Sequence, residues 1–187
     1  MTSEQIAELV RIGRNRGYVL YDEIDRILAP GREAIAELDT VLTELAKNSI
    51  DVFDEPRTEE SIPDASFFDG AEDLAPLRMY IHEVLKVPRL GPPEEKDLAR
   101  QVQLGGQDAE NAEKWLIEAN LWIVLATATH YANRGVKWLD IIQEGNIGLM
   151  RAVKGYNHLR DYAFSTYAVW WVRVAIRRFL SEGLSQP

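Results

Sequence analysis

Aromatic rings and arginines alternate along one stretch near the C-terminus, from Tyr156 to Glu182. Ser165 and Thr166 are favourable N-cap residues, and no Pro or Gly interrupts Tyr167 to Glu182, so we expect a helix that begins there. At about 100° per residue this helix has an apolar face and an opposite face of rings and arginines. The apolar face holds Ala168, Val172, Ala175, Ile176 and Phe179, and the opposite face holds Tyr167, Trp170, Trp171, Val174, Arg177 and Arg178, with Tyr162 and Phe164 just before it.

Large aromatic rings on an outward face are costly to leave in water, so they indicate a partner. Ring planes beside guanidinium groups suit unstacked bases and the phosphates that carry them, because stacking contributes roughly 1–3 kcal/mol per base. A base extruded from a duplex needs such a pocket. The alternative is a helix buried on all sides, whose tryptophans belong to the core. Composition by itself favours that alternative, since aromatics at helical spacing are usually core residues.

Two long motifs resemble one known family. The segment YAFSTYAVWWVR, Tyr162 to Arg173, resembles the signature of the bacterial sigma-70 family of transcription initiation factors, in the part that melts the promoter's minus-ten element. The segment LDIIQEGNIGLMRAV, Leu139 to Val153, resembles the same family's RNA-polymerase-binding helix. Because both motifs stand in the family's order and spacing, a chance match is excluded in practice.

The resemblance implies a role for the rings. Tyr167, with Phe164, Thr166, Trp170 and Arg160, would form the pocket for the flipped adenine of the minus-ten element. Trp170 and Trp171 would wedge at the fork of melted DNA, and Arg173 and Arg178 would hold phosphates. The implied DNA-binding residues are Arg78, Tyr80, Ile81, Arg160, Tyr162, Phe164, Thr166, Tyr167, Trp170, Trp171, Arg173, Val174, Arg177 and Arg178. Plain core packing remains the alternative for Tyr80 and Ile81, and an ion pair for Arg173.

Residues Leu139 to Lys154 predict a helix with two different faces. One face combines acidic, amide and apolar side chains: Asp140, Gln143, Glu144, Ile147 and Met150. The other holds Ile141, Ile142, Gly145, Gly148, Leu149 and Ala152. Two glycines inside a helix cost roughly 1 kcal/mol each, so we expect a neighbouring helix to approach them closely.

The mixed face suits a basic helical partner, and the resemblance implies that this partner is a coiled coil on the largest subunits of the polymerase core. The implied polymerase-binding residues are Leu121, Val124, Leu139, Asp140, Gln143, Glu144, Asn146, Ile147 and Met150. A merely solvated face would account for Asp140 and Glu144 but not for Ile147 and Met150 beside them.

Some residues depart from the family pattern. Val174 stands where glutamine is usual and Arg177 where threonine is usual, which predicts altered or relaxed reading of the upstream edge of the minus-ten element. Asn157 and Ala163 replace an acid and a lysine beside the adenine pocket, and His82 replaces an arginine. Trp122 also replaces an arginine, and the sequence offers no account of it.

Composition excludes several classes of protein. The chain has no cysteine, so it contains neither disulfides nor Cys-based metal sites, which fits a cytoplasmic protein. Its three histidines lack metal-site spacing, and neither a signal peptide nor a membrane span is recognisable. No nucleophile–His–acid set or phosphate-binding Gly loop indicates catalysis, so we expect a binding protein without cofactor or metal.

Charge divides the chain unevenly. The net charge is −9, yet residues 1–75 hold 18 acidic against 7 basic side chains, whereas residues 76–187 hold 12 against 14. The acidic front half is either ordinary solvated charge or a module that occupies, or repels DNA from, a cationic site.

We predict an all-α protein in three parts. Residues 1–53 form an acidic module of three helices resembling the family's region 1.1, with Gly17 ending the first helix, Ala29-Pro30-Gly31 closing the second and a short extended piece at Ile50–Phe53. Residues 54–72 form a disordered linker. Residues 73–187 resemble regions 1.2 and 2, with helices over 73–86, 92–104, 109–133 and 139–154 before the last.

The chain stops at Ser185-Gln186-Pro187, before the linker domain and the helix-turn-helix that the family usually carries. It is thus either a fragment or a minimal factor. The resemblance favours a sigma factor, monomeric when free, that binds the polymerase core and opens promoters. The alternative is a regulatory or decoy protein that docks on polymerase and occupies its DNA channel without opening promoters.

Overall fold

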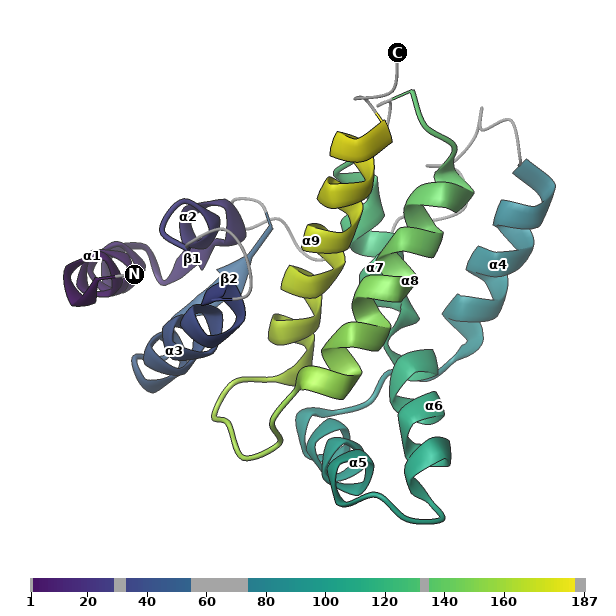
Figure 1. Cartoon of the computed structure of the whole chain (residues 1–187), viewed down its shortest axis with the longest axis horizontal. Coiled ribbons are helices and arrows are strands. Elements are labelled where there is room, and N and C mark those ends of the chain that lie inside the picture. The colour runs from purple at the N-terminus through teal and green to yellow at the C-terminus, as the bar shows by residue number, and fades with distance from the viewer. Residues whose placement is uncertain (1, 29–32, 55–73, 132–134, 184–187) are drawn as a thin grey trace. The chain divides into compact units, whose positions relative to one another are not determined.

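The computed structural model describes residues 2–28, 33–54, 74–131 and 135–183, and this part of the chain is all-α apart from one pair of short strands (Figure 1). The chain divides into two compact units: Met1–Glu59 with Arg160–Tyr162, and Glu60–Leu159 with Ala163–Pro187. No helix among the described residues is both long and apolar enough to cross a membrane. The predicted linker, apart from Asp54, and the predicted turn at Ala29–Gly31 lie outside the described residues.

The first helix of the N-terminal unit, α1 (Ser3–Arg16), has its ends set by sequence. Thr2 and Gln5 form a capping box, in which the Gln5 backbone N–H donates to Thr2 Oγ1 at 3.3 Å and the Thr2 N–H donates to Gln5 Oε1 at 2.8 Å. Gly17 ends the helix with φ 88°, a left-handed conformation that glycine adopts without strain. The predicted stop at Gly17 is confirmed.

The same unit contains α2 (Tyr21–Asp25), α3 (Glu33–Lys47) and two strands. Strand β1 (Tyr18–Leu20) pairs in parallel with β2 (Asp51–Phe53), with Val19 opposite Val52. The extended piece expected near residues 50–53 is therefore confirmed as β2, whereas β1 was not predicted, because three residues are too short to show a period. The buried core is made of Leu9, Val19, Tyr21, Ile24, Leu38, Val41, Leu42, Leu45 and Ile50.

The second unit begins with α4 (Leu74–Lys86) and α5 (Pro92–Leu104), whose predicted bounds are confirmed to within a residue. Pro92 begins α5 because the first helical position needs no N–H donor. Gly105 follows the helix with φ 69°, where a side chain would be strained.

The single helix predicted over 109–133 is instead two helices. α6 (Ala109–Ala119) ends at Asn120, whose backbone has φ −112° and ψ 8°, and α7 (Leu121–Thr129) follows directly. Asn120 is buried and its side-chain amide donates to the Leu116 carbonyl at 3.0 Å. No Pro or Gly marks this break, so the local sequence did not predict it. The predicted end at Asn133 lies outside the described residues.

The last two helices, α8 (Trp138–Gly155) and α9 (Phe164–Gly183), lie side by side and form the centre of this unit, with α7 against both (Figure 1). α9 begins at Phe164, three residues before the predicted start, so Ser165 and Thr166 lie in its first turn rather than ahead of it. Phe164 is fully buried and meets the Tyr156 ring edge to face at 5.3 Å. Burial of this ring thus holds the first turn of α9 in the core.

Candidate functional site

The two predicted faces of α8 are confirmed. All six residues of the predicted inner face are buried, namely Ile141, Ile142, Gly145, Gly148, Leu149 and Ala152. The inner face meets α9 very closely at one glycine: a Cβ on Gly148 would lie 2.6 Å from the Trp171 carbonyl oxygen and 2.8 Å from Val172 Cα. A Cβ on Gly145 would lie 2.6 Å from a methyl of Val124 on α7. The two glycines therefore allow neighbouring helices to approach closely. This close approach was predicted because glycines are costly inside a helix.

The opposite face of α8, which we name the α8 outer face, consists of Asp140, Gln143, Glu144, Ile147 and Met150. Gln143 and Met150 are exposed, Met150 by 40%, and the other three are half-buried. An exposed methionine next to a half-buried isoleucine leaves apolar surface in water, and two carboxylates flank it. Such a face can take a partner helix that offers both apolar and basic side chains.

Other predicted polymerase-binding residues lie beside or beneath this face. Leu139 and Asn146 on α8 are half-buried, as is Leu121 on α7. Val124 is fully buried, because it fills the space left by Gly145. In the free chain its apolar side chain therefore serves the packing of α7 on α8, and its contact with a polymerase partner stays a prediction.

The rings of α9 are more enclosed than predicted. Only 2% of Tyr167 and 4% of Trp170 is exposed, so the prediction of an outward ring face is wrong at these two positions. Trp171, Val174 and Arg177 are half-buried and only Arg178 is exposed. The physical reason is that α9 is apolar or aromatic on nearly every side and approaches α8 closely at Gly148, so its rings become part of the core.

Five rings, which we name the ring cluster, meet one another at the start of α9. They are Tyr156, Phe164, Tyr167, Trp170 and Trp171. Tyr156 contacts Phe164 and Tyr167, with centroids 5.3 and 5.8 Å apart, and Trp171 lies 6.3 Å from Tyr167 and 5.5 Å from Trp170. Tilted and edge-to-face pairs at these separations are favourable. Burial, and secondarily the charge of Glu95, raises the pKa of Tyr156 above its ordinary value, so this phenol stays neutral.

The predicted phosphate contacts differ in accessibility. Arg178 is exposed and its Nε donates to Glu182 at 2.8 Å, a bond that raises the pKa of the guanidinium. Arg173 is only 5% exposed, which favours the alternative of an internal role over a phosphate contact. Thr166 is half-buried beside the ring cluster. Arg160 and Tyr162 are grouped with the first compact unit.

The predicted DNA contacts on α4 also differ among themselves. Arg78 is exposed, whereas Ile81 is 1% exposed, so core packing is the correct reading of Ile81. Tyr80 is half-buried and its hydroxyl donates to Asn146 Oδ1 on α8 at 3.2 Å. Burial raises the pKa of Tyr80, which keeps the hydroxyl a donor.

Sequence reasoning missed a polar group beneath the ring cluster. Glu95 on α5 is only 4% exposed and accepts a hydrogen bond from the Asn120 side chain at the break between α6 and α7. Burial raises the pKa of Glu95 to about 7, against the opposing effect of that bond. The sequence signal that could have identified Glu95 was its spacing, because it shares one helical face with Ala99 and Gln103. The structure also explains Trp122, because the Arg89 guanidinium lies over its ring, 4.1 Å from the ring centre.

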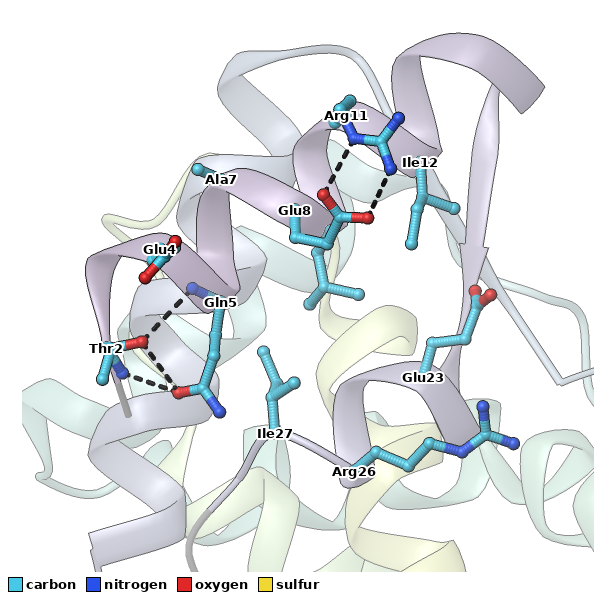
Figure 2. Close-up of a pocket in the computed structure, with 11 residues that line it drawn as sticks. Thr2, Glu4, Gln5, Ala7, Glu8, Arg11, Ile12, Glu23, Arg26 and Ile27 are labelled. Carbon is cyan, nitrogen blue, oxygen red and sulfur yellow. Dashed lines mark hydrogen bonds and ion pairs between the residues drawn. The ribbon is translucent and has the colours of Figure 1, made fainter.

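The N-terminal unit carries a separate open groove between α1 and α2, with a volume of about 600 Å³ (Figure 2). Ile12 and Ile27 lie along it, and Glu8 pairs with Arg11 at its edge through bonds of 2.6 and 2.8 Å. These bonds hold the pKa of Glu8 below its ordinary value. None of the residues predicted to bind DNA or polymerase lines this groove.

Comparison with known proteins accounts for nearly the whole chain. Family models match sigma-70 factor region 1.1 at residues 1–74, sigma-70 factor region 1.2 at residues 76–108 and sigma-70 region 2 at residues 116–183. The RNA polymerase sigma factor SigA of Clostridium acetobutylicum is 37% identical over 180 residues, which cover 95% of this chain and 47% of that protein.

Two further relatives carry the same name. SigA of Listeria monocytogenes is 34% identical over 197 residues, covering 97% of this chain and 52% of its own length. SigA of Lactococcus lactis is 46% identical over 107 residues, covering 57% of this chain and 28% of its own length. The chain therefore spans about half the length of the first of these relatives. Three consecutive regions of one family, in the family's order, establish that the chain belongs to the sigma-70 family.

Proposed function

We propose that this chain acts as a sigma factor, or as the part of one that docks on the RNA polymerase core and recognises and melts the minus-ten element of promoters. The α8 outer face carries this proposal, because it leaves apolar and acidic side chains together at the surface of an otherwise well-packed helix. Membership of the sigma-70 family supports it, and so do the relatives named RNA polymerase sigma factor.

Docking would use the α8 outer face against a coiled coil of the largest polymerase subunits. Asp140 and Glu144 would pair with basic side chains, and Ile147 and Met150 would cover apolar ones. Since exposed ion pairs contribute little, most of the affinity would come from burying the apolar pair. Leu139 and Asn146 border this surface and would lie at its edge.

Melting would use the ring cluster as a receptacle for bases of the non-template strand. In the free chain Tyr167 and Trp170 are covered, so DNA or polymerase must uncover them before a base can stack. Unstacking a base step costs a few kcal/mol, and stacking on aromatic rings returns roughly 1–3 kcal/mol per base. Capture therefore favours DNA that is already opened, which is how binding alone can drive melting.

Reading of the upstream edge would fall to Val174 and Arg177, both half-buried on α9. Valine cannot donate or accept a hydrogen bond, whereas arginine can donate to guanine. We infer relaxed or altered preference at the upstream base pair. A binding panel that varies this pair measures it, and an unchanged preference for the family's usual base would contradict the inference.

Docking is tested by measuring the affinity of the chain for core polymerase, with Gln143→Ala as the variant. Gln107→Ala is the matched control, because it removes another exposed glutamine, from the turn between α5 and α6. The expected result is an affinity loss of about fivefold or more for Gln143→Ala alone, the size of one hydrogen bond with a partner. Equal affinities would contradict a contact between Gln143 and polymerase, and docking through α8 as a whole is contradicted if Met150→Ala also leaves the affinity unchanged.

Capture is tested on a forked promoter fragment with a single-stranded minus-ten element, in the presence of core polymerase. Arg178→Ala and Arg100→Ala form a matched pair, since each removes an exposed arginine that pairs with an acid on its own helix. Only Arg178→Ala is expected to weaken capture. If the unaltered chain binds polymerase without capturing the fork in a sequence-dependent way, the decoy alternative replaces promoter melting.

A further inference from the structure

One face of α5 is built around three residues spaced four apart, Glu95, Ala99 and Gln103. Ala99 is 1% exposed and Glu95 4%, so this face packs against the rest of the second unit. Gln103 lies at the end of the face, one residue before the helix ends. Its surface is largely exposed, yet both ends of its side-chain amide are engaged far along the chain.

The Gln103 amide joins α5 to the segment that follows α8. Its Nε2 donates to the Tyr156 backbone carbonyl at 2.5 Å. Because a carbonyl can only accept, the amide nitrogen must face Tyr156, and the amide oxygen must then face His158. His158 Nδ1 lies 2.5 Å from Gln103 Oε1. Since that oxygen can only accept, His158 must carry its proton on Nδ1.

Tyr156 connects the two hydrogen bonds of Gln103 to the ring cluster. It is fully buried, it directly follows α8, and its ring contacts both Phe164 and Tyr167. The backbone next to it is equally constrained, because a Cβ on Gly155 would lie 2.9 Å from the Tyr167 hydroxyl oxygen. A shift of the chain at Tyr156 therefore moves the rings that begin α9.

We propose that Gln103 is a positioning residue for the ring cluster: by holding the Tyr156 carbonyl and the His158 ring from α5, it fixes how the rings of α9 are presented to a base. This inference rests on the proposed function, because presentation matters only if the rings receive DNA. Gln103 does not touch the DNA in this scheme, and it acts through Tyr156.

The first measurement uses the free chain and does not depend on DNA. NMR of the imidazole nitrogens is expected to find His158 mainly as the Nδ1–H tautomer in the unaltered chain. Gln103→Met keeps the length of the side chain but removes both hydrogen bonds, so His158 should shift toward Nε2–H and the Tyr156 and Tyr167 ring signals should move. Gln101→Ala is the control, because the partner of the Gln101 side chain within the described residues is Asp97, on its own helix.

The second measurement uses the chain bound to core polymerase and a forked fragment. The readout is the ratio of affinities for adenine and for an abasic site at the flipped position. Gln103→Met should lower this ratio about fivefold, the factor that corresponds to one net hydrogen bond. Polymerase affinity should be unchanged, since the α8 outer face is untouched. Gln103→Glu keeps the acceptor for His158 but loses the donor to Tyr156, so it should retain the Nδ1–H tautomer and still lose adenine preference.

The outcomes separate the two proposals. If the unaltered chain captures no fork while Gln103→Met still shifts His158 and the tyrosine rings, the proposed function fails and the positioning of the rings by Gln103 stands as a structural property. If Gln103→Met leaves those signals where Gln101→Ala leaves them, the positioning role is overturned. It is equally overturned if the variant captures forks with undiminished preference for adenine.

Discussion

Helices α8 and α9 pack against each other, yet they use their surfaces in opposite ways. α8 has two faces that differ in chemistry. The face turned inward is apolar, and the face turned outward is mixed acidic and apolar. α9 has apolar or aromatic side chains on both of its faces, and it buries most of them. Helical periodicity separates an inner from an outer face when the two faces differ in polarity, as in α8. It does not do so when they are alike, as in α9.

The difference also bears on how each helix binds. Gln143 and Met150 on the α8 outer face are already exposed, so the docking proposed above would require no rearrangement of this helix. The ring cluster is closed in the free chain, with Tyr167 and Trp170 almost wholly covered. Under the proposed function, a base could reach these rings only after another binding event had opened the cluster. Base capture would then be restricted to the complex with polymerase.

The largest expected effect comes from breaking the contact between these helices. Gly148→Ala introduces a Cβ 2.6 Å from the Trp171 carbonyl oxygen and 2.8 Å from Val172 Cα, and backbone atoms cannot rotate away. We expect a loss of roughly 3 kcal/mol or more in the free energy of unfolding, measured by urea titration with circular dichroism.

Gly145→Ala is the matched comparison. Its Cβ would meet a methyl of the Val124 side chain at 2.6 Å, which can move by a rotamer change, and alanine gains about 1 kcal/mol of helix propensity. Its net cost should therefore be clearly smaller. Equal losses for the two variants would show that the backbone contact at Gly148 is not what limits the approach of α9.

An intermediate effect concerns the polar group beneath the rings. Glu95 has a pKa of about 7 in the fold, above its ordinary value of 4.5, because burial disfavours its charge. A raised pKa means that the folded state holds the proton more tightly. The stability from Glu95 is thus fully present below about pH 4.5 and is lost as the pH rises to about 7. Glu95→Gln removes this decline, since glutamine stays neutral and still accepts from Asn120.

The expected result at pH 8 is a Glu95→Gln variant more stable than the unaltered chain by on the order of 2–3 kcal/mol at most, with the gain vanishing near pH 4.5. Thermal unfolding at several pH values measures it. Glu110→Gln, at an exposed position on α6, is the control. A gain that is constant with pH would mean that Glu95 is charged in the fold throughout.

Much of this fold follows from local signals. Gly17, Pro92 and Gly105 set helix ends that the sequence predicts, because capping and backbone restriction act over a few residues. The inner face of α8 is predicted by the helical spacing of its apolar and glycine residues. The break at Asn120 does not, since a buried hydrogen bond to Glu95, distant in the chain, stabilises it.

The site was predicted less well, for a related reason. The motif in α9 indicates which residues matter, but exposure depends on how closely the neighbouring helix approaches. Ile81 and Val124 lie at positions matched to partner contacts and are nevertheless core residues. Gln103 was missed because its partners, Tyr156 and His158, lie more than fifty residues away.

The smallest expected effect on stability lies on the α8 outer face. Met150 is 40% exposed, so Met150→Ala removes contacts mainly with water, and alanine is an equally good helix former. The free energy of unfolding should change by less than about 0.5 kcal/mol. Leu149→Ala, one position along on the inner face, should cost about 2–5 kcal/mol because Leu149 is fully buried. If Met150→Ala unfolds the chain as readily as Leu149→Ala does, the methionine supports the fold and is not available to a partner. If Met150→Ala leaves stability intact while weakening polymerase binding, the apolar part of the α8 outer face serves docking. The two helices then differ as described, because α8 keeps apolar surface for a partner whereas α9 buries its own.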